Sequence, residues 1–331
     1  MKLRGPARLN VLNAVLMVVS SALAFALPFH LFLFAYAVLG PLHYLTEISW
    51  LHDRGYFASG GRGRNWWLGL VAVATGVLLL GYLTDAPPKY EIAFVYLVLF
   101  TALMLHFVKH AASAVALVAV TAAGIALASA SAAYFMFAYL LVTIIHVFVF
   151  TAMFVLHGAL RTRSWSAIAS LGVMIACAVG FFVVTPAATA PSASLRAVYD
   201  FFAPLNTQLL RIFGHSTRSV FDSRGGAAVM RFIAFSYTYH YLNWFSKTSI
   251  IKWHEVSRAR GAAIVLLWIA AVATFAYDYR IGVSVLYALS LVHVMLEFPL
   301  NHRTWLAILH RGQAKSLPLH VTAPARRPGP A

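Results

Sequence analysis

Uncharged apolar runs of about 20 residues recur from one end of the chain to the other, and about 20 such residues suffice for a helix to cross a bilayer. The 331 residues are 61% apolar and 10% charged, whereas soluble chains are about half apolar and about a quarter charged. The sequence therefore predicts an all-α, polytopic integral membrane bundle. It excludes an ordinary soluble domain, a disordered chain and a disulfide scaffold, since Cys177 is the single cysteine.

We predict ten transmembrane helices separated by short loops. The predicted spans cover residues 9–27, 29–51, 65–83, 92–110, 112–130, 133–158, 165–185, 227–250, 261–279 and 283–301. Pro28 separates the first two spans, where we expect a tight turn. The sequence Ala24-Phe25-Ala26 matches a signal-peptidase site, but a second apolar run follows it directly, so we expect an uncleaved first span.

Basic residues in short loops mark the cytoplasmic side of a membrane protein. They cluster at the N-terminus and after the even-numbered spans, whereas the odd-numbered spans end in less basic loops. Both termini are therefore expected on the cytoplasmic side. The membrane is expected to be the inner membrane of a bacterium. The same pattern accounts for the net charge of +16. No nucleic-acid partner is expected, because the sequence contains no basic face on a soluble domain.

Residues 1–320 form a single predicted transmembrane domain, followed by a disordered cytoplasmic tail at 321–331 that is rich in proline, alanine and arginine. The one long loop covers residues 186–226. Within it, Leu195 to Phe213 has apolar residues at helical spacing. We expect an amphipathic helix there, lying on the outer face of the membrane.

Fourteen histidines stand against nine carboxylates, and ten of the histidines lie in or just beyond the even-numbered spans. These spans are predicted to run in the same direction, so their C-terminal halves share one leaflet. Four histidines lie deepest, at roughly 15–22 Å from the cytoplasmic surface for a helical rise of about 1.5 Å per residue. These are His43, His146, His240 and His293.

The pattern HxxxExxxxH occurs twice, each time at the end of an even-numbered span. One copy is His43, Glu47 and His52, and the other is His293, Glu297 and His302. From the composition we expect about 0.007 copies by chance, so the repeat indicates two equivalent halves of a site or an old duplication. Residues four apart share a helical face, so each His and Glu pair can point at one ion.

A carboxylate inside a membrane span is costly and usually has a cation or metal as partner. Two glutamates with several neutral histidines suit iron, manganese or zinc. We therefore predict a metal site, with two iron ions as the favoured cofactor. The predicted metal ligands are His43, Glu47, His52, His106, His110, His240, His293, Glu297 and His302.

Four further residues are predicted to orient the ligands or to contact a substrate, namely Asp53, His157, Asn243 and Lys247. Lys247 has an alternative role, in which its amine extends to the membrane interface. His30 and His146 are interpreted as residues that form hydrogen bonds between helices.

These features predict a membrane-embedded metalloenzyme, and most specifically a non-haem di-iron oxygenase, hydroxylase or desaturase. A hydrophobic lipid or isoprenoid substrate would enter from the cytoplasmic leaflet, and an electron donor would be required. Three alternatives stay open. They are a zinc-dependent lipid hydrolase, a haem-binding membrane protein, and a proton or metal transporter.

Overall fold

The computed structural model describes residues 5–56, 62–83, 97–99, 101–102, 119, 140–184, 191–214 and 220–310, and this part of the chain contains helices and no strand. The N-terminal helices are α1 (Gly5–Ala26), α2 (Pro28–Phe34), η1 (Ala35–Leu39), α3 (Gly40–Asp53) and α4 (Arg62–Leu83). The middle of the chain forms η2 (Leu141–Phe150), α8 (Thr151–Thr162), α9 (Trp165–Val183), α10 (Ala193–Tyr199), η3 (Asp200–Phe202) and α11 (Ala203–Ile212). The last helices are α12 (Arg224–Ser246), α13 (Thr248–Ile251), α14 (Arg258–Tyr277) and α15 (Tyr279–Leu309).

Six helical stretches within the described residues are long and apolar enough to cross a membrane, as expected for an integral membrane protein. They are Ala7–Ala26, Pro28–Asp53, Thr143–Thr162, Trp165–Val183, Arg258–Tyr277 and Tyr279–Leu309. The third predicted span coincides with α4, which carries a shorter apolar stretch at Trp67–Val77. The fourth and fifth predicted spans lie almost wholly outside the described residues, so the total of ten stays a prediction.

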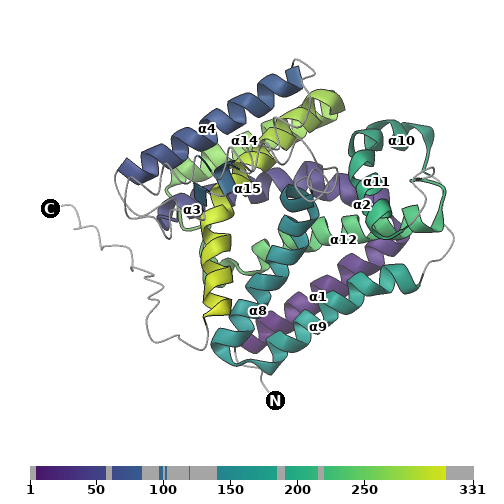
Figure 1. Ribbon diagram of the computed structural model, residues 1–331, viewed down its shortest axis with the longest axis horizontal. Coiled ribbons are helices and arrows are strands. Elements are labelled where there is room, and N and C mark those ends of the chain that lie inside the picture. Colours follow the sequence, from purple (N-terminus) through teal and green to yellow (C-terminus); the bar gives the residue numbers. More distant parts are fainter. Residues whose placement is uncertain are drawn as a thin grey trace.

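The central helix of the bundle is α12, whose side chains are buried along nearly its whole length. It packs against α1, α2, α9 and η2, and Figure 1 shows it beside the α1–α9 pair. Its residues include two arginines and three tyrosines, which explains why the length and apolarity that mark the six membrane-crossing stretches do not single it out. Neighbouring helices therefore screen its polar groups from lipid.

The helices α3 and α12 run side by side in the same direction. Near the middle of the bundle, the His43 and His240 rings are in contact. Further along both helices, the indole nitrogen of Trp50 donates to the carbonyl of Ile251, just beyond α12. This parallel packing places the C-terminal halves of both helices at the same depth.

The long loop forms two helices rather than one. Within the predicted helix from Leu195 to Phe213, the α-helix is interrupted at Asp200–Phe202, just before Pro204. Proline has no N–H with which to continue the helical hydrogen bonds, and its ring restricts the preceding turn. Both helices pack on the bundle, where Tyr199 donates to Asn206 in a buried 2.7 Å hydrogen bond.

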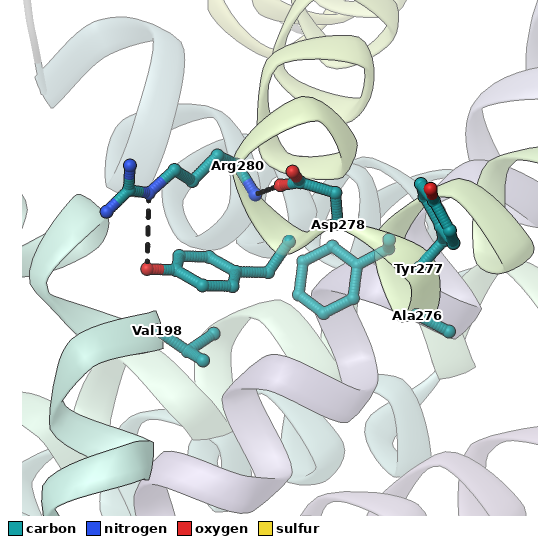
Figure 2. A pocket seen from close by; sticks show the side chains of 7 residues that line it. Val198, Ala276, Tyr277, Asp278 and Arg280 are labelled. Atoms are coloured by element: carbon teal, nitrogen blue, oxygen red, sulfur yellow. Dashed lines mark hydrogen bonds between the residues drawn. The ribbon is translucent and has the colours of Figure 1, made fainter.

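A tight turn joins α14 to α15. The side chain of Asp278 accepts hydrogen bonds from the backbone N–H groups of Arg280 and Ile281 and so caps α15. Figure 2 shows this turn beside Val198 of α10. The residues of the turn and Val198 line an open depression there. Near the start of α15, Gly282 lies directly against Phe275 of α14, so that a Cβ added at Gly282 would stand 2.3 Å from the Phe275 Cα.

Candidate metal centre

Four histidines from four helical elements meet in the interior of the bundle. They are His43 of α3, His146 of η2, His240 of α12 and His293 of α15, all buried. The centroid of the His43 ring lies 4.7 Å from that of His240 and 4.8 Å from that of His293. The His146 ring closes the group at 5.2 Å from His240 and 5.3 Å from His293.

Two buried glutamates complete this group. The Glu47 carboxylate lies 3.2 Å from His43 Nε2 and 3.9 Å from His293 Nε2. The Glu297 carboxylate lies 3.4 Å from His146 Nδ1 and 4.0 Å from His293 Nε2. These six side chains are called the His4Glu2 group, comprising His43, Glu47, His146, His240, His293 and Glu297.

A π-helical turn leads into the first half of the group. Pro41 has no N–H to donate, and the N–H of Gly40 bonds the carbonyl of Ala35, five residues back. The wider turn η1 results, and His43 and Glu47 follow it on one face of α3.

Irregular helix geometry also surrounds the other ligands. His146 lies within η2, a π-helical segment of ten residues, and π-helical turns occur frequently at functional sites. In α15, Pro299 stands two residues after Glu297. Figure 1 shows α15 bent, with its C-terminal part turned away from its first half. A proline inside a helix accounts for such a bend.

Hydrogen bonding fixes the tautomer of His240. The Thr151 hydroxyl lies 2.8 Å from the Val147 carbonyl, which can only accept a hydrogen bond. The hydroxyl proton is therefore used there, and the same oxygen accepts from Nδ1–H of His240 at 2.7 Å. The lone pair of His240 is then on Nε2, which lies 3.1 Å from His43 Nε2 in the centre of the group.

Several buried polar atoms of the group have no hydrogen-bond partner among the described residues. They are His43 Nδ1, both ring nitrogens of His146 and of His293, and one oxygen of Glu297. Buried polar atoms are normally paired, because leaving one unsatisfied costs about 1–3 kcal/mol. A cation bound among these atoms would satisfy those that face the centre.

The arrangement of the ligand atoms suits metal ions. Two overlapping sets of residues each have ligand atoms that lie within 4.8 Å of one another. The first set is His43, His240 and His293, and the second is His146, His293 and Glu297. Metal bonds of about 2.0–2.2 Å place neighbouring ligand atoms about 3 Å apart. The closest pairs in the group, at 3.1, 3.2 and 3.4 Å, are near this spacing. His293 belongs to both sets.

The structure brings five of the nine sequence-predicted ligands together, namely His43, Glu47, His240, His293 and Glu297. It places His52 at the surface, with a 61% exposed side chain 3.4 Å from Asp53. His302 lies beyond Pro299 and is half-buried. His106 and His110 lie outside the described residues.

The four predicted supporting residues have different surroundings. Asp53 forms an ion pair of 2.5 Å with Arg260 and so joins α3 to α14. His157 is half-buried on α8. Asn243 is buried and accepts from the hydroxyl of Tyr239. Lys247 lies close enough to Glu47 for their charges to interact.

Sequence reasoning missed His146 as a member of the group. It was interpreted as a hydrogen-bonding residue between helices, whereas its ring packs against His240 and His293 beside Glu297. The signal that could have included it is its depth, which matches that of the other three histidines.

Comparison of the chain with protein-family profiles, curated proteins and solved structures found no match.

Replacing Thr151 by valine is expected to weaken metal binding by about 10–100-fold, the usual effect of removing a group that orients a metal ligand. Valine has a similar shape but cannot accept from His240, so the ring loses its fixed tautomer. Thr151→Ser should retain wild-type affinity. Competition titration with a metal-binding dye measures the effect.

Thr162→Val is the matched control, because the Thr162 hydroxyl also bonds a carbonyl four residues back and, within the described residues, forms no hydrogen bond with a histidine. Wild-type affinity in Thr151→Val would contradict this orienting role.

Proposed function

We propose that this protein is a membrane-embedded metalloenzyme whose His4Glu2 group holds two metal ions. The observation that carries the proposal is the meeting of six ligand side chains, two of them carboxylates, within the interior of a membrane bundle. Burying two neighbouring carboxylates is costly without positive charge beside them. Lys247 offers one positive charge near Glu47, and metal ions would provide the rest.

Iron is the metal that we favour, and oxygen-dependent chemistry is the proposed reaction class. His146, His293 and Glu297 amount to two histidines and one carboxylate, the ligand set of many non-haem Fe(II) oxygenases. Bound iron would supply the activation of dioxygen. The residues of the chain would hold the ions and exclude water from the reacting centre.

The proposed substrate is a hydrophobic lipid or isoprenoid that reaches the centre from the bilayer. Exposed apolar side chains on α14, including Leu266 and Leu267, present a surface suited to lipid contact. In the proposed orientation the group faces the cytoplasmic side of a bacterial inner membrane. Arg54, Lys252 and Arg258 are exposed at the corresponding helix ends, as the positive-inside rule requires.

A zinc-dependent hydrolase is the second candidate, and one feature favours it. His43, His240 and His293 form a three-histidine set, the ligand set of some catalytic zinc sites. Glu47 lies 3.2 Å from His43 Nε2 and is placed to act as a base toward a zinc-bound water. Fewer histidines would then be needed than the group contains, so iron is preferred.

Metal analysis of the purified protein, with a visible spectrum, tests the proposal. Two irons per chain without a Soret band are expected. Zinc alone would favour the hydrolase and a Soret band would indicate haem. The absence of any stoichiometric metal would contradict all three.

In the same assay, Glu47→Ala and Glu297→Ala should each lose metal while the protein still inserts into the membrane. Glu255→Ala is the control, because Glu255 is an exposed glutamate paired with Lys252 outside the bundle core. Full metal content and activity in both core variants would show that the site is wrongly placed.

A further inference from the structure

Three aromatic side chains lead from the His4Glu2 group to the surface. The Trp244 ring lies 5.6 Å from the His43 ring, measured between centroids. Trp50 follows at 5.5 Å from Trp244, and Tyr56 at 5.2 Å from Trp50. Trp244, Trp50 and Tyr56 are called the aromatic chain.

Hydrogen bonds hold both indoles of this chain in place. The indole N–H of Trp244 donates to the Thr46 hydroxyl at 3.0 Å, and Thr46 is fixed by its own bond to the Leu42 carbonyl. The indole N–H of Trp50 donates to the carbonyl of Ile251 at 3.0 Å. The packing of α3 on α12 therefore sets the distances from Trp244 to His43 and to Trp50, whereas Tyr56 follows α3 directly in the chain.

Exposure increases along the aromatic chain. His43 and Trp244 are buried, whereas Trp50 and Tyr56 are half-buried. At the outer end, the guanidinium of Arg303 lies over the Tyr56 ring, 5.7 Å from its centroid. The chain thus connects a fully enclosed site with the protein surface through rings in successive contact.

The preference of tryptophan for the membrane interface explains the position of Trp165. Trp165 is 83% exposed at the start of α9, as expected for a residue at the membrane interface. Trp244, by contrast, turns its indole inward, between a histidine of the group and a second indole. Contact with headgroups does not account for that position.

We propose that the aromatic chain carries single electrons from the surface to the His4Glu2 group when the centre becomes over-oxidised. Indole and phenol are the protein side chains most readily oxidised by one electron besides thiols, and short ring separations favour transfer between them. This inference rests on the proposed redox-active iron centre. It assigns the chain a protective function, in which oxidising equivalents leave the core when no substrate is present.

Hydrogen peroxide serves as the oxidant, and the electrons balance as follows. With iron bound, peroxide would take two electrons from the metal and two protons from solvent, and would leave as two waters. The aromatic chain would return these two electrons one at a time. For each of them, Trp244 would give one electron to the centre, Trp50 would give one to Trp244, and Tyr56 would give one to Trp50 and release its phenol proton to bulk water. A thiol would then restore Tyr56 by supplying one electron and one proton.

Two other oxidisable rings near the centre are enclosed within the bundle. The Tyr44 ring lies 5.1 Å from His293 and the Tyr241 ring 5.0 Å from His43, and both side chains are buried. Blocking the aromatic chain should therefore redirect oxidation to this pair.

The test treats the iron-loaded full chain in detergent with hydrogen peroxide, without substrate or thiol, and maps oxidised residues by mass spectrometry. Wild type should be oxidised at Trp50 and Tyr56 above an iron-free control. In Trp244→Phe, oxidation at both sites should fall to the level of that control, while oxidation of Tyr44 and Tyr241 rises. Trp50→Phe, which leaves the contact with His43 unaltered, should spare Tyr56 but not Trp244.

Trp268→Phe is the matched control, since this indole also donates to a backbone carbonyl, that of Val38, but lies outside the aromatic chain. Unchanged oxidation of Tyr56 in both Trp244→Phe and Trp50→Phe would overturn the inference while the iron centre stands. A wild-type protein that binds no iron would overturn the proposed function, and the inference with it, before peroxide is added.

Discussion

A His293→Ala variant is expected to lose both metal ions, because His293 is the one residue present in both ligand sets. Its Nε2 lies 3.9 Å from the Glu47 carboxylate and 4.0 Å from that of Glu297. Removing a group that merely orients a ligand weakens binding by about 10–100-fold, and removing a shared ligand should exceed that range at both positions. Metal content and titrated affinity measure the loss.

His302→Ala is the control on the same helix, and it should keep wild-type metal content. His146→Ala provides a graded comparison, since His146 belongs to one set and not to the other. We expect it to retain one ion. Loss of a single ion in His293→Ala, or equal effects of all three variants, would contradict the shared position of His293.

The first two residues of each repeated motif lie in the His4Glu2 group, whereas the third lies outside it. Each histidine and glutamate four residues apart share a helical face, and both pairs enter the His4Glu2 group. The last histidine of each motif lies nine residues after the first. At about 100° per residue it has turned through roughly half a circle, to the opposite side of the helix. The exposure of His52 follows from that rotation.

Helix phase explains why the face of His146 could not be predicted. Periodicity arguments assume 3.6 residues per turn, but His146 lies inside the π-helical η2, whose turns contain more residues. The run Leu141–Phe150 contains no proline or glycine that would indicate such a segment. Its depth in the membrane depends on distance along the helix and was therefore predictable.

The apolar runs predicted helices well but not which helix lies at the centre. Length and hydropathy identify α1, α9 and α14 as helices that can span a membrane, yet the helix at the centre of the bundle is the more polar α12. Its tyrosines and His240 are tolerated because neighbouring helices cover them. Such coverage depends on contacts between distant segments, as where Asn13 of α1 accepts from Tyr239. A sequence read one span at a time does not contain that information.

A Gly282→Ala variant is expected to destabilise the protein by about 3 kcal/mol, near the upper end of the usual cost of overpacking a core. The added Cβ would stand 2.3 Å from the Cα and 2.8 Å from the backbone nitrogen of Phe275. Backbone atoms cannot rotate aside as a flexible side chain can, so α14 and α15 would have to separate at their turn. The free energy of unfolding in mixed micelles measures the effect.

Gly172→Ala is the opposite case and serves as the control. Gly172 lies in the middle of α9, and a Cβ there would meet nothing within 4 Å. Alanine in a helix interior is favoured over glycine by about 0.5–1 kcal/mol, so this variant should be slightly more stable. Equal stability of the two variants would mean that α14 and α15 do not pack as closely at Gly282 as the structure indicates. Because His293 and Glu297 follow on α15, separation of the two helices should also lower metal affinity in Gly282→Ala, and not in Gly172→Ala.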